Sequence, residues 1–255
     1  MAITEGPAST EIKGVIFDLG NTLLFFNGEW DEVAKELYAE LSRSLISLGF
    51  DLEKAEFIHL FHSQIQAYFE DRDRRHIELT TAFVLQNTLA DLGFSQITEE
   101  ELKRPLAEMY AVSQQRWLVE NDAITTLNFL LETGYRVGMI SNAGNDDDVQ
   151  TLIDNAGFRP YFDFILTSAA EGYRKPNQKI FQKVFDYWHF LPGEIAMVGD
   201  TLEADILGAI DMEMVSIWIT RRVQIPNDAD ILLSIQPDYK IDSLSELPAL
   251  LSQIK

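Results

Sequence analysis

The chain of 255 residues contains no cysteine. Disulfide bonds, thiolate catalysis and cysteine-based zinc sites are therefore excluded, because each needs the sulfur atom of that residue. A reducing cytoplasm is the simplest compartment for such a composition. The sequence also lacks any apolar run near the roughly 20 residues that cross a bilayer, so we expect no membrane partner.

Positive charge is scarce in this sequence. There are 20 Lys and Arg residues against 41 Asp and Glu residues, which gives a formal net charge of −21. Such a field repels a phosphate backbone, so nucleic acid is not an expected partner. A small anionic substrate remains compatible with this charge where local cations or a metal ion offset the carboxylates.

Short apolar runs that end at a polar residue alternate with segments of helical spacing from about residue 122 onward. Runs of this kind predict strands that are buried on both faces. The expected strands cover residues 14–17, 136–140, 162–166, 195–199, 214–219 and 237–241. Their alternation with helices predicts an α/β fold with a Rossmann-like parallel sheet and right-handed crossovers.

A different pattern fills residues 27–120, where no strand is evident and four long amphipathic stretches follow one another. Helices are expected at 30–48, 52–69 and 77–92, and a fourth begins at Thr98, where Glu101 completes a capping-box pattern. Four such helices can bury a common core. We therefore expect an α/β core formed by residues 12–26 and 121–255, an inserted four-helix cap domain at 27–120, and a loose tail at 1–11.

Three polar side chains stand at the ends of expected strands: Asp18, Ser141 and Asp200. Ligands of open parallel sheets bind beyond the carboxyl ends of the strands, so this topology predicts that the three side chains meet at one edge. Each has a plainer interpretation when it is taken alone, as a turn residue or as the cap of a following helix. Their common placement favours a binding site.

The segment 18–22 places a carboxylate before a Gly-Asn turn, which suits a nucleophile with backbone amides that face an anion. Ser141 and Asn142 offer a hydroxyl and an amide that suit phosphate oxygens. The loop 199–205 carries two carboxylates, and hard oxygen ligands of this kind suit magnesium. Lys175 lies just ahead of a helix, where its ammonium could neutralise Asp18 and a bound anion.

Together these segments resemble the haloacid dehalogenase-like hydrolase superfamily, in the branch with a helical cap inserted after the first motif. The resemblance extends from about Lys13 to the C-terminus. The matching stretches are Phe17-Asp18-Leu19-Gly20-Asn21-Thr22-Leu23, Ile140-Ser141-Asn142, Arg174-Lys175-Pro176-Asn177 with Ile180-Phe181, and Val198-Gly199-Asp200 through Asp205.

This resemblance implies a magnesium-dependent phosphomonoester hydrolase that acts on a small phosphorylated metabolite. Asp18 is then the nucleophile that becomes an aspartyl-phosphate, and Lys175 stabilises the transferring group. The implied phosphate-binding residues are Ser141, Asn142, Asn21 and Thr22. The implied Mg²⁺ ligands are Asp18, the backbone carbonyl of Gly20, Asp200 and Asp205.

Gly20 departs from the family pattern, because family phosphatases usually carry a second aspartate two residues after the nucleophile. That aspartate acts as general acid and base, a contribution of typically about 10²–10⁴-fold in rate. The departure leaves several alternatives open: a slow phosphatase, a phosphatase with another proton donor, or a catalytically impaired phosphate-binding or regulatory protein. A 2-haloacid dehalogenase is a further alternative, since its chemistry needs no acid at this place.

The most polar stretch of the expected cap runs from Asp71 to His76. Arg72 and Arg75 could meet an anionic group of the substrate, and His76 could supply a proton near neutral pH. We favour the plainer interpretation, a solvated turn with local ion pairs. His59 and His62 are interpreted as partly buried helix residues rather than metal ligands. The sequence leaves both a monomer and a dimer open.

Overall fold

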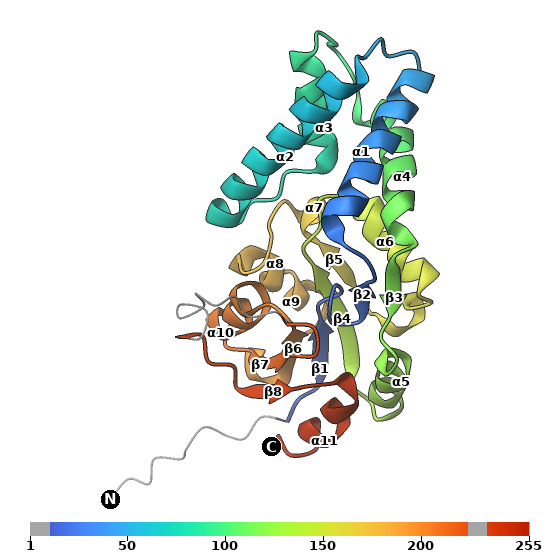
Figure 1. The fold of residues 1–255 in the computed structure, drawn as a ribbon. Coiled ribbons are helices and arrows are strands. Elements are labelled where there is room, and N and C mark those ends of the chain that lie inside the picture. Colours follow the sequence, from blue (N-terminus) through green and yellow to red (C-terminus); the bar gives the residue numbers. More distant parts are fainter. Residues whose placement is uncertain (1–10, 224–233, 255) are drawn as a thin grey trace, which may run out of the picture.

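The computed structural model describes residues 11–223 and 234–254, so the expected tail lies outside the described residues except for Glu11. Six parallel strands form one sheet in the order β5-β4-β1-β6-β7-β8 (Figure 1). The strands are β1 (Gly14–Phe17), β4 (Arg136–Ser141), β5 (Ile165–Thr167), β6 (Ile195–Gly199), β7 (Val215–Ile219) and β8 (Tyr239–Ile241). The expected Rossmann-like α/β fold is therefore confirmed.

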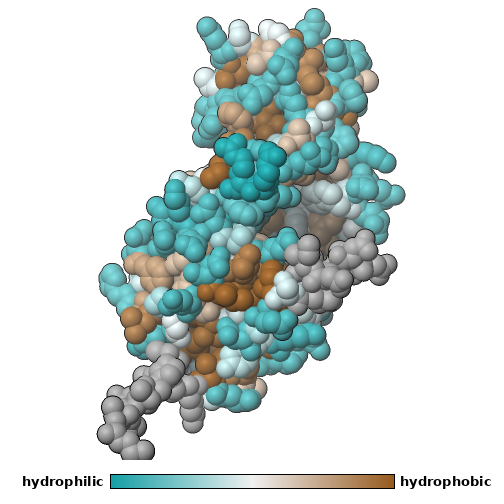
Figure 2. Space-filling view, turned by 90° about the vertical axis from the view of Figure 1, so that its left-hand side faces the viewer, coloured by the Kyte–Doolittle hydropathy of each residue, from teal (hydrophilic) through white to brown (hydrophobic). Residues whose placement is uncertain are grey.

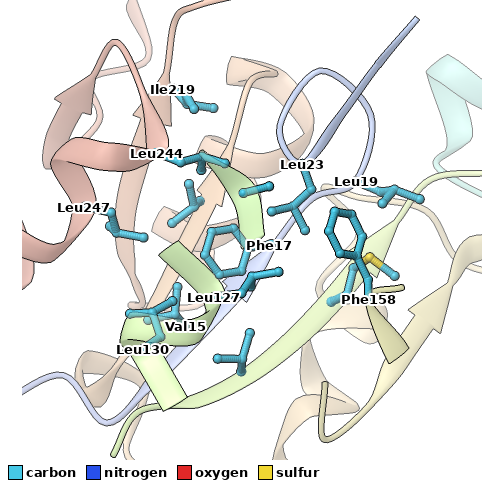
Figure 3. Close-up of a cluster of buried hydrophobic side chains, with 14 of the residues drawn as sticks. Val15, Phe17, Leu19, Leu23, Leu127, Leu130, Phe158, Ile219, Leu244 and Leu247 are labelled. Atoms are coloured by element: carbon cyan, nitrogen blue, oxygen red, sulfur yellow. The ribbon is translucent and has the colours of Figure 1, made fainter. Parts of the chain in front are cut away.

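Helices cover both faces of this sheet, which explains why its central strands are apolar without alternation. Val15 and Phe17 of β1 face one hydrophobic cluster, whereas Ile16 between them belongs to a second cluster on the opposite face. The first cluster is packed by α5 (Ala123–Glu132), α6 (Asp146–Asn155) and α11 (Leu247–Leu251). Figure 3 shows Val15 and Phe17 beside Leu127 and Leu130 of α5.

Shorter helices pack the opposite face of the sheet. They are α8 (Gln178–Gln182), α9 (Val184–Tyr187) and α10 (Leu207–Asp211), while α7 (Ser168–Glu171) directly follows β5. A single π-helical turn, Leu202–Ile206, leads from the end of β6 into α10. Short 3-10 turns at Arg159–Tyr161, Pro192–Glu194 and Leu244–Glu246 complete the core.

Four helices lie between β2 (Leu24–Phe26) and β3 (Trp117–Val119) in the chain and stand above the sheet as a separate lobe (Figures 1 and 2). They are α1 (Trp30–Ser47), α2 (Lys54–Arg75), α3 (Thr81–Asp91) and α4 (Glu99–Gln114). These helices bury a hydrophobic cluster of their own. The domain boundaries expected at residues 26/27 and 120/121 stay a prediction.

The start of α4 follows the sequence pattern closely. Thr98 accepts a hydrogen bond from the backbone N–H of Glu101, and the Glu101 carboxylate accepts one from the backbone N–H of Thr98. This reciprocal capping satisfies two donors that a helix N-terminus otherwise leaves unpaired. A local pattern of four residues was therefore enough to fix where the helix begins.

Two other expectations for this region are wrong. β2 and β3 form an antiparallel pair, so the stretch 27–120 does contain a strand, and its three residues are too few to show an alternating pattern. The second helix continues to Arg75 and the third begins only at Thr81. Asp71 pairs with Arg74 and Arg75 at helical spacing, which stabilises the extra turn of α2.

Within the described ranges, no helix combines the length and the apolar character needed to span a membrane. Even α2, with 22 residues, carries charged side chains along its length.

Candidate active site

The carboxyl edge of the sheet brings together the polar residues that follow distant strands. Asp18 follows β1, Ser141 ends β4 and Asp200 follows β6, and all three line one cavity of about 1280 Å³. The opposite wall of this cavity is formed by side chains of α1, α2 and α4 from the cap. The cavity therefore lies between the sheet edge and the inserted helices.

Lys175 is the central cation of this edge, and its side chain is almost completely buried. Its ammonium Nζ donates to Asp18 Oδ1 at 2.6 Å and to the backbone carbonyl of Ile140 at 2.7 Å. The same Nζ lies 2.6 Å from Asp205 Oδ1, as an ion pair. The lysine thus bridges the ends of β1 and β4 and the π-helical turn after β6.

The backbone of Lys175 is held by Asn142, one residue beyond β4. The Lys175 N–H donates to Asn142 Oδ1 at 2.8 Å, and Asn142 Nδ2 donates to the Lys175 carbonyl at 3.0 Å. The Asn142 amide was expected to face phosphate oxygens, and the structure instead engages both its oxygen and its nitrogen with the lysine backbone. Asn142 therefore fixes the position from which the ammonium reaches Asp18.

Asp18, Asp200 and Asp205 each offer a carboxylate oxygen, and these three oxygens lie within 4.8 Å of one another. Such a set of hard oxygen donors fits Mg²⁺ in its chemistry. Asp205 is committed elsewhere, because its Oδ2 accepts from the Thr201 N–H at 3.0 Å while its Oδ1 pairs with Lys175. Asp18 and Asp200 are thus the better candidates for direct ligands, and Asp205 holds the lysine.

Gly199 and Trp218 shape the surroundings of these carboxylates. An added Cβ on Gly199 would overlap the Asp205 carboxyl group, so the absence of a side chain lets Asp205 lie against β6. The Trp218 indole Nε1 donates to the backbone carbonyl of Asp200 at 2.7 Å. The Asp200 backbone is therefore anchored to the neighbouring strand β7.

Burial and mutual repulsion disturb the titration of this cluster. Burial, together with the carboxylates of Asp205 and Asp200, raises the pKa of Asp18 to about 7, although Lys175 acts in the opposite direction. Burial and Asp205 likewise raise the pKa of Asp200 to about 6. Burial lowers the pKa of Lys175, but Asp18 and Asp205 outweigh it and the net shift is upward. The site therefore holds more negative charge than one ammonium can offset.

The remaining expected phosphate-binding residues differ in their placement. Ser141 and Asn21 both line the cavity, and Asn21 adopts a left-handed conformation with φ of 57°, which asparagine tolerates better than most residues. Thr22 is fully buried, and its hydroxyl has no hydrogen-bond partner among the described residues. Its side chain does not line the cavity.

Of the three expected specificity residues, only Arg72 lines the cavity, where its guanidinium lies 3.8 Å above the Phe69 ring. Arg75 is exposed and pairs with Asp71. His76 ends α2 in a left-handed conformation and uses its backbone carbonyl to accept from Arg174 N–H at 3.2 Å. Figure 2 shows the hydrophilic side chains that gather where the cap meets the core.

His59 and His62 differ from their interpretation as partly buried residues. Both are exposed on α2 and line the cap wall of the cavity. Neither belongs to the carboxylate cluster that could hold a metal ion in the described part of the chain.

The cavity is lined by Gly20, where family phosphatases usually carry an aspartate, and by a further carboxyl group, Asp148. Gly20 lines the cavity, and an added Cβ there would lie 3.4 Å from the Trp117 ring, an ordinary contact distance. Asp148, in the first turn of α6, also lines the cavity and accepts from Gln114 Nε2 at 2.9 Å. Burial raises the pKa of Asp148 to about 6.

Glu78 and Ser168 were not found from the sequence, and Arg174 was named only as part of the stretch that carries Lys175. Their side chains form one buried group between the cap and the loops that carry Ser141 and Lys175. Ser168 follows the end of β5, so the same strand-end argument that selected Asp18 could have selected it. Nothing local in the sequence marks Glu78, because its two partners in the core lie 90 and 96 residues away.

A carboxylate held by a buried lysine, at the carboxyl edge of a parallel sheet and beneath a helical insert, defines a capped α/β enzyme. The haloacid dehalogenase-like hydrolase family matches residues 12–212. The chain therefore belongs to this family, as its motifs predicted, and it is a hydrolase.

Two relatives align over most of the chain. The glyceraldehyde 3-phosphate phosphatase of Methanothermobacter thermautotrophicus is 27% identical, over 82% of this chain and 85% of that protein. The N-acylneuraminate-9-phosphatase of Mus musculus is 25% identical, over 96% of each chain.

Solved structures share the fold. A HAD phosphatase from Thermococcus onnurineus has a TM-score of 0.63 at 27% identity, over 94% of this chain and 98% of that chain. The 2-haloacid dehalogenase from Pseudomonas syringae has a TM-score of 0.65 at 23% identity, over 95% and 99% of the two chains, which shows the fold alone.

Replacement of Lys175 by methionine should destabilise the metal-free protein mainly at alkaline pH. Removal of one partner of a buried ion pair typically costs roughly 3–5 kcal/mol. The raised pKa values of Asp18 and Asp200 mean that these groups become protonated as pH falls, and neutral carboxyls need no cation. The loss in unfolding free energy should therefore be large at about pH 8 and small at about pH 5.5.

Urea unfolding with EDTA at both pH values measures this difference. Lys179→Met is the matched control, because the ammonium of that exposed lysine contacts only the hydroxyl and ring of Tyr173 in the described structure, and the variant should lose little at either pH. An equal loss at both pH values for Lys175→Met would show that the lysine stabilises the fold through packing rather than through its charge.

Proposed function

We propose that this hydrolase is a magnesium-dependent phosphomonoester phosphatase that acts through an aspartyl-phosphate on a small phosphorylated metabolite. The observation that carries the proposal is the 2.6 Å contact between Lys175 Nζ and Asp18 Oδ1 inside a cavity that also holds two further carboxylates. The phosphatase names of the two aligned relatives support it. The cysteine-free composition supports a cytoplasmic location as part of the same proposal.

In the first step, a carboxylate oxygen of Asp18 forms a bond to phosphorus, and the bond between phosphorus and the ester oxygen breaks. The leaving oxygen takes up a proton. In the second step, water attacks phosphorus, the aspartyl-phosphate bond breaks, and inorganic phosphate and the free Asp18 carboxylate are released. Lys175 faces the developing negative charge in both steps, which is how phosphoryl transfer is mainly accelerated.

A carboxylate that approaches a phosphate dianion is repelled unless further positive charge is present. Asp18, Asp200 and the backbone carbonyl of Gly20 are the proposed Mg²⁺ ligands, and Asp205 holds Lys175. A bound Mg²⁺ would supply charge neutralisation and orient the phosphoryl oxygens. Ser141 and Asn21, which line the cavity, are the proposed contacts of those oxygens.

The proton for the leaving group needs a source other than position 20. Asp148 is our candidate, because it lines the same cavity and its pKa of about 6 leaves part of its population protonated near neutral pH. Gln114 binds one of its oxygens and thereby fixes the orientation of the carboxyl group. Gly20 also favours a second candidate function, a phosphate-binding protein without turnover.

The cavity is larger than a triose phosphate needs, and residues of the cap helices line it together with residues of the core. Arg72 is the residue of the polar Asp71–His76 stretch that lines it, so we propose Arg72 as a contact for an anionic or polar part of the substrate.

Hydrolysis of p-nitrophenyl phosphate tests the proposal directly. We expect release of p-nitrophenol that needs Mg²⁺, stops when EDTA is added and disappears in Asp18→Asn. Asp200→Asn should raise the Mg²⁺ concentration that gives half-maximal activity by at least about tenfold, since it removes the charge of one proposed ligand.

No release by the wild type over a broad panel of phosphate esters, with phosphate binding retained, would favour the binding protein. Chloride release from 2-chloroacids in the presence of EDTA would favour a dehalogenase instead.

Gly20→Asp should accelerate hydrolysis of esters with poor leaving groups, such as alkyl phosphates, more than hydrolysis of p-nitrophenyl phosphate. The backbone accepts a Cβ at this position at an ordinary distance from Trp117, so the new carboxyl group can be built without displacing the ring. The ratio of kcat/KM for the two ester types measures the effect. An unchanged ratio would mean that an aspartate at position 20 adds nothing to the proton transfer that Asp148 is proposed to supply.

Asp148→Asn should lower kcat/KM for alkyl phosphates by about 10²-fold, within the range of a lost general acid, and affect p-nitrophenyl phosphate much less. Asp147→Asn is the matched control, because Asp147 is the exposed neighbour in the same helical turn. Equal losses for both ester types would contradict a role for Asp148 in protonating the leaving group.

A further inference from the structure

The segment between α2 and α3 leaves the cap and pairs with the core directly before Lys175. Glu78 N–H donates to the Gly172 carbonyl at 3.1 Å, and Arg174 N–H donates to the His76 carbonyl at 3.2 Å. Ile77 and Tyr173 form a β-bridge between the two segments. The cap is therefore joined to the core by this contact as well as by the covalent connections at β2 and β3.

A second backbone contact extends this junction to the loop after β4. Thr81 N–H, at the start of α3, donates to the Gly144 carbonyl at 2.7 Å. Gly144 follows Ser141 and Asn142 in that loop, so the cap segment touches both loops that face the phosphate position.

Glu78 is the buried centre of the junction, and its carboxylate is fully enclosed. Its Oε2 accepts from Arg174 Nη1 at 2.6 Å and from Ser168 Oγ at 2.5 Å, and its Oε1 accepts from the Tyr68 hydroxyl of α2. One carboxylate thus ties a cap helix, helix α7 and the loop of Lys175 together. A buried charge of this kind is stable only while its donors stay in place.

Each core partner of Glu78 leads to a residue of the proposed site. Arg174 is the neighbour of Lys175 in the chain. Ser168 Oγ accepts from the Ala143 N–H at 2.8 Å, and Ala143 follows Asn142, which itself holds the Lys175 backbone. Displacement of the cap would therefore remove the Glu78 contacts of Arg174 and Ser168 at the same time.

We propose that Glu78 is a positioning residue that couples the seating of the cap to the alignment of the Lys175 and Ser141 loops. The inference rests on the proposed phosphatase function and concerns how that same site is held in its active arrangement. When the cap is seated, Glu78 holds Arg174 and Ser168, and the ammonium and hydroxyl that face the phosphoryl group are in register. When the cap lifts, the Glu78 contacts are lost and the two loops are no longer aligned. The site is then inactive while it is open to solvent.

Glu78→Gln tests this inference, because it keeps the size of the side chain and removes the charge. Small misplacements of catalytic groups can cost about 10²-fold in rate, so we expect kcat for p-nitrophenyl phosphate to fall by at least about tenfold. KM should change by less than about threefold, since Glu78 does not line the cavity and so does not contact the substrate directly.

Glu108→Gln is the matched control. Glu108 is also a cap carboxylate bound by a serine and an arginine, Ser44 and Arg104, but both of these partners belong to the cap. It should leave kcat within about twofold of wild type. Arg174→Met should reproduce the Glu78→Gln defect, and the double variant should be no worse than either single variant, as expected for residues that act as one unit.

Hydrogen exchange supplies a readout that does not need catalysis. In Glu78→Gln the amides of Glu78, Thr81 and Ala143 and of the segment 172–175 should exchange faster, whereas Glu108→Gln should leave them unchanged. Ser168→Ala gives a milder disruption if Glu78→Gln does not fold, and it should accelerate exchange at Ala143.

Wild-type kcat in Glu78→Gln, an equal loss in Glu108→Gln, or faster exchange confined to residues 76–81 would each overturn the coupling. If wild-type protein hydrolyses no phosphate ester, the proposed function fails, while the exchange experiment still decides whether Glu78 connects the cap to the two loops.

Discussion

The ammonium of Lys175 is the constraint on which the site depends, because it is buried among carboxylates that would otherwise repel one another. Its three contacts lie at or just beyond the ends of three different strands: Asp18 follows β1, Ile140 lies near the end of β4, and Asp205 lies in the turn after β6. The sheet order β4-β1-β6 makes these positions neighbours. The fold thus serves the chemistry by placing one positive charge where negative charge is concentrated. Raised pKa values for Asp18 and Asp200 show that this single charge does not complete the balance.

Local patterns predicted those parts of the fold that depend on local physics. Buried strands such as Ile195–Gly199 and the capping box at Thr98 were found because burial and capping leave a signature within a few residues. The pair of β2 and β3 was missed, since three-residue strands gain their stability from a partner about 90 residues away. The extension of α2 to Arg75 was missed because ion pairs with Asp71 outweigh the polar composition of that turn.

The candidate site divides in the same way. Asp18, Ser141 and Asp200 could be placed together from the topology of strand ends, and the family resemblance added Lys175 to them. The structure brings all four to one cavity. The hydrogen-bond partners of each side chain lie far away in the sequence, so the spacing of residues does not predict them. The Asn142 amide binds the lysine backbone, Thr22 is buried and does not line the cavity, and Glu78 binds partners in the other lobe.

The hydrogen bond from Trp218 to the Asp200 carbonyl has an optical consequence. Indole emission responds to the polarity and hydrogen bonding around its nitrogen, and this nitrogen is attached to the peptide group of a carboxylate that faces the cation position. A Mg²⁺ ion bound by Asp200 as proposed would therefore alter the emission of Trp218. Trp218 would then report cation binding at the sheet edge without an added dye.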